Sequence, residues 1–342
     1  MAGLTLGFIT NSKKLLNGSL AMTTNTGTVV PSKQVEKKQH GFWLDLLRRL
    51  ICEKPLGTFG LVIVIILLLT GIFASFLAPF GMSQIHLLDS LKPPSSTYLL
   101  GTDELGRDIL SRLIFGARVS MIIGLGATVL SEGLATLIGV VSGYFGGTLD
   151  LIIQRFVDAW MSIPGLLMIM TVMTIVGNGL PQLILIIGIQ GAIGHSRVIR
   201  SAVIGIKSNM YVSAADAIGS RPFHIILRHI IPNVMSVIIV GFTLSVGGAI
   251  MYEASLSFLG FGVPPGVPSW GSMLSREGRQ YMEAAPTLAL WPGAALTLVV
   301  YGINMFGDAL RDLLDPRLRG GVGRYDLKEK NVKINKAHAV KS

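Results

Sequence analysis

Three polar residues interrupt long apolar stretches of this 342-residue sequence: Glu132, Glu253 and Asn304. A carboxylate that sits in lipid without a partner is strongly destabilising, so such groups usually have a defined role. They either line a path for a polar solute or ion, or pair with a hydroxyl or a cation on a neighbouring helix. For Glu132, in the middle of its stretch, we slightly favour pairing. All three are candidate residues of a translocation path.

A second polar group forms one segment, residues 209–233, between two apolar stretches. Asn209 and Gly219 are suited to begin and end a helix of about nine residues, which is too short to be stable alone in water. A second short helix follows, and Pro232 is expected to close the unit. The segment is either a docking site for a partner or an ordinary interfacial loop. Its candidate contact residues are Tyr211, Ser213, Ala214, Ala215, Asp216, Gly219, Arg228 and Pro232.

Helical spacing predicts which side chains of this segment share a face. In the first helix Tyr211, Ala214, Ala215 and Ile218 fall on one nearly flat face, and Ser213 and Asp216 point elsewhere. In the second helix the predicted apolar stripe is Phe223, Ile226, Leu227 and Ile230, and the predicted cationic stripe is Arg221, His224 and Arg228.

Signatures of an enzyme are mostly absent from the sequence; Gly194-His-Ser-Arg197 superficially resembles the G-x-S of an intramembrane serine protease, but no later span carries a His to act as base. The sequence has no G-x-x-x-x-G-K-[ST] loop for a nucleotide phosphate. His224 and His229 are five residues apart, about 140° around an α-helix, which does not suit two ligands of one metal ion. The net charge is +10, but the cations do not form the aromatic-interleaved patch of a nucleic-acid-binding protein. We therefore expect no catalytic residue, no cofactor, no metal ion and no nucleic-acid partner.

The composition indicates a protein built for lipid. Hydrophobic residues make up 50% of the chain and charged residues only 14%, whereas a soluble domain has about 25% charged residues. Since about 20 apolar residues cross a bilayer, we expect an all-α membrane protein with six transmembrane helices. The third span is short and carries Pro164, so it should extend back through Asp158 and kink. The six predicted spans are 56–78, 119–143, 161–175, 183–200, 234–258 and 288–310.

An even number of spans places both termini on the same side of the membrane. Most of the 29 Lys and Arg residues fall in the two terminal segments and in the loops on that side. The positive-inside rule therefore predicts that both termini, and the segment 209–233, are cytoplasmic.

Segment 209–233 also resembles the E-A-A-x-x-x-G-x9-I-x-L-P loop in the membrane subunits of bacterial ABC importers. Ala214, Ala215, Gly219 and Pro232 match this pattern, and Ser213 occupies the position where the family usually has Glu. The peptide/nickel permease branch is the most similar, through Tyr211-Val212, Arg228-His229-Ile230-Ile231-Pro232-Asn233 and the Gly-Thr-Asp-x-x-Gly-Arg-Asp motif at 101–108. The resemblance extends from about residue 54 to residue 319.

The resemblance implies a type I ABC importer permease in the inner or plasma membrane of a prokaryotic cell. Its implied partners are a second, similar permease subunit, two ATP-binding subunits that contact segment 209–233, and an extracytoplasmic solute-binding protein. The implied substrates are peptides or related small solutes, including nickel. The rival hypothesis is a stand-alone ion-coupled transporter or channel that uses Glu132 and Glu253. Such proteins usually show inverted repeats or paired broken helices, and neither is evident here.

Four regions follow from these patterns. Residues 1–40 are a flexible cytoplasmic tail, and 41–118 hold an amphipathic helix, the first span and an external loop. Residues 119–312 form a five-helix permease core that contains the coupling segment, and 313–342 are a basic cytoplasmic tail. In the external loop we expect Thr102 to cap a helix that has Asp103 and Glu104 in its first turn.

Overall fold

The computed structural model describes residues 42–314 except 276, 282 and 284. Two compact units divide the chain, Met1–Phe42 and Trp43–Ser342, and apart from Phe42 the described residues belong to the second. The predicted tails, except residues 313 and 314, lie outside the described residues.

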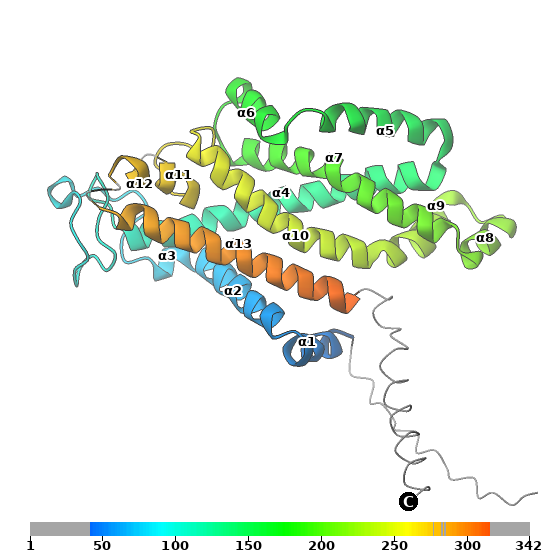
Figure 1. Ribbon diagram of the computed structural model, residues 1–342, viewed down its shortest axis with the longest axis horizontal. Coiled ribbons are helices and arrows are strands. Elements are labelled where there is room, and N and C mark those ends of the chain that lie inside the picture. The colour runs from blue at the N-terminus through cyan, green and yellow to red at the C-terminus, as the bar shows by residue number, and fades with distance from the viewer. Residues whose placement is uncertain (1–41, 276, 282, 284, 315–342) are drawn as a thin grey trace, which may run out of the picture. The chain divides into compact units, whose positions relative to one another are not determined.

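The regular elements of the described part are helices, apart from one isolated bridge between Thr102 and Asp108 (Figure 1). Two of them depart from α geometry: η1 is a 3₁₀ helix and η2 is a π-helix. The elements in chain order are α1 (Phe42–Glu53), α2 (Pro55–Ile72), α3 (Ala74–Leu77), η1 (Leu87–Asp89), α4 (Ile109–Phe145), α5 (Gly147–Met161), α6 (Gly165–Val176), α7 (Leu180–Lys207), α8 (Met210–Ala217), α9 (Pro222–Ile225), η2 (Ile226–Ile230), α10 (Ile231–Phe258), α11 (Trp270–Ser275), α12 (Glu277–Gln280) and α13 (Thr287–Leu314).

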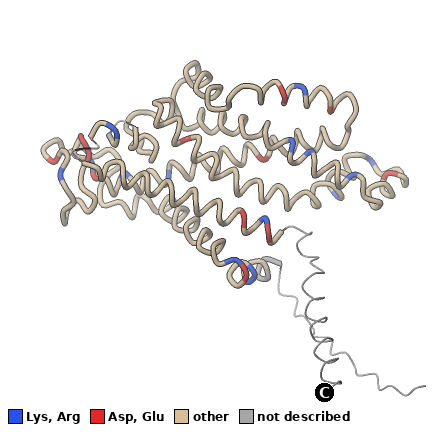
Figure 2. Tube along the Cα trace, viewed as in Figure 1, with Lys and Arg blue, Asp and Glu red and all other residues tan. Residues whose placement is uncertain are grey.

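Five helices of the described chain are long and apolar enough to cross a membrane: α2, α4, α7, the continuous run Pro222–Phe258, and α13. The third predicted span, 161–175, falls on α6 and the last residue of α5, two helices that are bent by 83° at the break between them. Pro164 precedes α6; its ring removes a backbone donor and disfavours helical geometry at the residue before it. The expected kink near Pro164 is therefore a complete break. Charged residues gather toward the ends of the long helices and are sparse along their middles (Figure 2).

Close helix contacts at glycine hold these spans together. α4 packs mainly along α7, α2 packs against α13, and α10 contacts α4, α7 and α13. A Cβ at Gly60 of α2 would overlap the carbonyl oxygen of Gly302 in α13, and a Cβ at Gly139 of α4 would lie 2.7 Å from the carbonyl oxygen of Ser196 in α7. In lipid, where apolar burial does not drive association, such close backbone contact is a main source of packing energy.

Two sequence-based boundaries were wrong. Helix α4 begins at Ile109, ten residues before the predicted span, so it crosses the predicted region boundary at 118/119. Its N-cap is Asp108, whose carboxylate accepts from Ser111 N at 2.8 Å, and Thr102 caps nothing. The reason is a tight turn at Gly106 (φ 72°), where the Asp103 carboxylate accepts from the backbone amides of Leu105 and Arg107.

Helix α7 also continues past its predicted end at residue 200, as far as Lys207. The arginines near its predicted end are paired: Arg197 with Asp158 and Arg200 with Asp150, both on α5. Because carboxylates on α5 neutralise these arginines, α7 can continue as a helix past them.

We predict that Gly60→Ala destabilises the protein in detergent by about 1–3 kcal/mol, because the new methyl group has no space against α13. The measurement is the midpoint of thermal unfolding. Gly133→Ala on α4 is the matched control, since a Cβ there meets no heavy atom within 4 Å. An equal loss of stability in both variants would contradict the packing explanation.

Candidate functional site

Helix α8 forms the tip of the segment that joins α7 to α10 (Figure 1). Its first turn is held by the backbone carbonyl of Asn209, which accepts from Val212 N and Ser213 N; the Asn209 side chain makes no capping bond. At the other end Gly219 has φ 81°, and Ser220 N and Gly219 N donate to the carbonyls of Ala215 and Asp216. These two bonds form a Schellman motif, so Gly219 ends the helix as predicted.

The face of α8 that packs on the chain consists of Val212 and Ala215. Both lie in a buried cluster with Val203 of α7, Ile225 of α9 and Ile230 of η2. The predicted grouping of Ala215 with Tyr211, Ala214 and Ile218 was therefore wrong, because Ala215 is buried while the other three are exposed. Since α8 is too short to persist alone, this seat explains how it keeps its helical form.

The opposite side of α8 presents large apolar side chains to the outside. Met210 is 88% exposed and Ile218 is 83% exposed, and Phe223 in the adjoining α9 is also exposed. Ser213, Ala214 and Asp216 are exposed as well. Clustered apolar groups at the tip of a polar loop are typical of a docking surface.

The second helix of the segment does not end at Pro232, where the sequence predicted its end. The helix that starts at Pro222 continues through the π-turn η2 into α10 as one span. A proline inside an α-helix would remove a backbone bond and press its ring against the carbonyl of Arg228, and the wider π-turn accommodates it. Asn233 Nδ2 donates to the carbonyl of His229 at 2.6 Å.

The buried face of this helix differs from the predicted apolar stripe, whereas the predicted cationic stripe is exposed. The fully buried residues are Ile225 and Ile230, whereas Phe223 and Leu227 are exposed. The rings of His224 and His229 lie 6.5 Å apart, closer than α-helical spacing predicts, and Tyr211 lies 6.1 Å from His229. Within the described residues no group of three or more His, Cys, Asp and Glu is arranged to hold a metal ion.

Glu132 of α4 is buried and paired. Its Oε1 accepts a hydrogen bond from Ser245 Oγ of α10 at 3.0 Å and lies 2.6 Å from Nδ1 of His195 on α7. The pairing expected for this residue is therefore confirmed, with a hydroxyl and an imidazole on two neighbouring helices.

The other two candidate path residues lie apart from this cluster. Glu253, near the other end of α10, is fully buried and accepts from Ser257 Oγ at 2.7 Å, and the same hydroxyl accepts from Val263 N at 3.3 Å. Glu253 thus helps to hold the loop that follows α10. Asn304 on α13 is exposed, close to Gly247 of α10. The structure does not bring the three candidates into one site.

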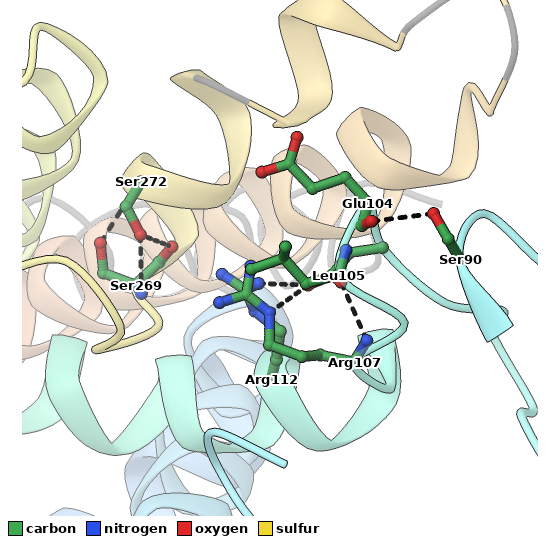
Figure 3. A network of polar contacts seen from close by, with 8 residues as sticks. Ser90, Glu104, Leu105, Arg107, Arg112, Ser269 and Ser272 are labelled. Carbon is green, nitrogen blue, oxygen red and sulfur yellow. Dashed lines mark hydrogen bonds and ion pairs between the residues drawn. The ribbon is translucent and has the colours of Figure 1, made fainter. Parts of the chain in front are cut away.

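The loop before α4 contains a buried ionic cluster. The Asp103 carboxylate pairs with Arg107 Nε at 2.7 Å and also with Arg112, and Ser90 Oγ donates to the carbonyl of Glu104 at 2.8 Å (Figure 3). These contacts explain why the 101–108 motif is a folded turn: its charges hold the loop onto the start of α4.

A polar pair, the buried Tyr98 and the half-buried Asp89, supports the same loop. Hydrogen bonds from Lys92 and then from Tyr98 hold the pKa of Asp89 below its usual value, and the Asp89 carboxylate raises the pKa of Tyr98. The Tyr98 hydroxyl donates to Asp89 Oδ2 at 2.8 Å. At neutral pH both groups therefore stay in the protonation states that this contact requires.

Several functional neighbours were missed from sequence. Val212, which seats α8, lies between the predicted contact residues Tyr211 and Ser213. Its apolar side chain is the sequence feature that could have indicated a buried position. His195 and Ser245 are separated from Glu132 by 63 and 113 residues, so no local pattern connects them. The π-turn could have been suspected from Pro232 and Asn233, a proline and an amide side chain at the start of an apolar run.

Apolar spanning helices with few charges in their middles, and a loop seated at the end of the helices that flank it, are the features of a multi-pass membrane protein. Two family models match the sequence: "Binding-protein-dependent transport system inner membrane component" over residues 135–320, and "N-terminal TM domain of oligopeptide transport permease C" over residues 41–94. The chain belongs to the family of binding-protein-dependent transport system inner membrane components. It is thus an importer permease subunit and not an enzyme.

Similar proteins cover most of the chain. It is 38% identical to the oligopeptide transport system permease protein OppC of Bacillus subtilis, over 84% of this chain and 94% of that protein. It is 36% identical to the dipeptide permease DppC of Alkalihalophilus pseudofirmus (81% and 90%) and 35% identical to the glutathione permease GsiD of Pectobacterium atrosepticum (85% and 95%). An inward-facing structure of the MetNI methionine ABC transporter matches 60% of this chain and 96% of its own, with a TM-score of 0.49 and 19% identity.

We predict that Gly219→Val loosens the end of α8, because a β-branched residue at φ 81° is strained by about 1–2 kcal/mol. Cleavage of the 208–221 loop by a protease should become about tenfold faster. Gly205→Val is the matched control, since Gly205 has open space around it and lies within α7. Equal cleavage rates for Gly219→Val and the unmodified protein would show that the left-handed position is not needed.

Proposed function

We propose that this permease subunit couples to its ATPase through α8. The observation that carries the proposal is the two-sided character of this helix: Val212 and Ala215 fasten it to the chain, and Met210 and Ile218 are left almost fully exposed. Bare apolar groups beside Arg221 and Arg228 suit a groove in another protein. A movement of that groove would be transmitted to α7 and α10, the helices on either side of α8.

The residues of the predicted contact set have different roles in this proposal. Tyr211, Ser213, Ala214, Asp216 and Arg228 are exposed and would touch the ATPase. Those that shape the segment from within are Ala215, which seats α8, Gly219, which ends it, and Pro232, which lies in the continuous helix.

We further propose the assembly: a second, similar permease subunit, two ATP-binding subunits and an extracytoplasmic solute-binding protein, with both termini of this chain in the cytoplasm. The excess of Lys and Arg on the α8 side supports the orientation. The named relatives transport oligopeptides, dipeptides and glutathione, so we propose peptides as the substrate class. Asn304 stays a candidate for the translocation path because its side chain is exposed within a span, whereas Glu132 and Glu253 are buried.

The stand-alone ion-coupled transporter is the less favoured hypothesis. Its two carboxylates, Glu132 and Glu253, are buried and do not meet. Family membership also favours an importer that works with an ATPase.

We predict that Met210→Glu combined with Ile218→Glu prevents the ATPase subunits from co-purifying with the tagged permease in mild detergent. Each apolar side chain that is buried on docking contributes about 1.5–3 kcal/mol, so binding should weaken by at least roughly 100-fold. Because both residues are exposed, membrane insertion and thermal stability should not change.

The matched control is Leu88→Glu, a change at a side chain that is 97% exposed in the loop before α4. It adds the same kind of charge at a distance from α8 and should leave ATPase association intact. Retained association of the Met210/Ile218 variant would refute the docking role, and ion-driven uptake by the permease alone would support the stand-alone hypothesis.

We also predict that Ser213→Glu is tolerated and raises substrate-stimulated ATP hydrolysis by up to about fivefold, the effect of a partly screened ion pair. Ser213 is exposed, so the new carboxylate can reach a basic residue of the ATPase. Ser213→Gln, similar in size but uncharged, should behave like the unmodified protein. A complete loss of transport in Ser213→Glu would show that this position is filled sterically.

A further inference from the structure

One carboxylate oxygen joins three helices inside the membrane-spanning region. Glu132 Oε1 on α4 is contacted by His195 from α7 and by Ser245 from α10. Helix α7 runs directly into α8, and α10 continues the helix that follows it. The two helices that flank the coupling segment therefore meet at the same atom.

Other polar contacts of α7 among the described residues reach only one neighbour each. Gln190 accepts from Trp160, Arg197 pairs with Asp158 and Arg200 with Asp150, all on α5, and Lys207 Nζ donates to the carbonyl of Tyr144 at the end of α4. These contacts fix α7 beside α4 and α5 but do not involve α10. The contact of Glu132 differs because it links both flanking helices to α4.

The second oxygen of the carboxylate, Glu132 Oε2, is buried and has no hydrogen-bond partner among the described residues. It faces Gly241 of α10, where an added Cβ would lie 3.3 Å from Oε2 and 3.0 Å from His195 Cε1. A buried carboxylate that uses only one oxygen is incompletely satisfied. A second helix arrangement that gives Oε2 a partner would therefore compete with this one.

We propose that Glu132 is a positioning residue for transport, which holds α7 and α10 to α4 in the conformation seen here and releases them when α8 is displaced. The inference rests on the proposed coupling role of α8. A directional contact suits this purpose because a helix shift of about 1–2 Å breaks a charge-assisted hydrogen bond, whereas apolar side chains slide past one another.

Two substitutions separate this role from simple packing. Glu132→Gln keeps an oxygen that can accept from His195 and Ser245, whereas Glu132→Met fills a similar volume without an acceptor. We expect the assembled complex with Glu132→Gln to keep most of its ATP hydrolysis that is stimulated by peptide-loaded binding protein. We expect Glu132→Met to assemble normally, to keep its unstimulated hydrolysis, and to lose about tenfold in both stimulation and peptide uptake in proteoliposomes.

Matched controls test the link to both flanking helices. Asp158→Ala removes a contact that joins α7 only to α5, and should leave stimulation unchanged. Ser245→Ala should lower stimulation, and adding it to Glu132→Met should cause no further loss, because the two changes remove the same contact.

The proposal is overturned if Glu132→Met is stimulated like the unmodified complex, or if the losses of Ser245→Ala and Glu132→Met simply add. It is also overturned if Glu132→Gln and Glu132→Met fail equally to assemble, which would indicate a packing role alone. Failure of the proposed function is distinguishable, because the complex without substitutions would then show no stimulation.

Discussion

Lipid offers no hydrogen bonds, and this constraint shapes the whole chain. Polar groups within the spans must be satisfied by the protein itself, and an ionic contact between two helices fixes one relative to the other. Arg197 and Arg200 hold α5 beside α7, and Glu132 holds three helices together. Between these contacts, glycines such as Gly60 and Gly139 bring backbones close enough for dispersion to act.

The same constraint explains why segment 209–233 can be both firm and exposed. Helix α8 lies beyond the apolar spans, yet its Val212 and Ala215 reach back into a cluster formed by the ends of α4, α7 and η2. The segment therefore borrows stability from the spanning helices while its outer side stays bare. A free loop of this length would have to be ordered on binding, which would weaken the association.

Sequence predicted the membrane class, most spans and the position of α8, because hydropathy, proline and glycine act locally. Gly219 ends α8 for the reason inferred from its residue type. The errors arose where distant residues decide: Ala215 is buried because α7 and η2 cover that side, and α7 continues because Asp150 and Asp158 neutralise its arginines. At Pro232 a local rule failed because a π-turn accommodates the ring.

The unbroken helix from Pro222 to Phe258 has 37 residues, which makes it a rod about 55 Å long. Ser245 divides this rod into arms of about 35 Å toward the loop and about 20 Å toward the far end. If Ser245 is the fulcrum, a displacement of the tip by about 5 Å swings the far end by about 3 Å in the opposite direction. Such a swing would narrow the space beside the helix at one membrane face and widen it at the other, while the helix itself keeps its fold.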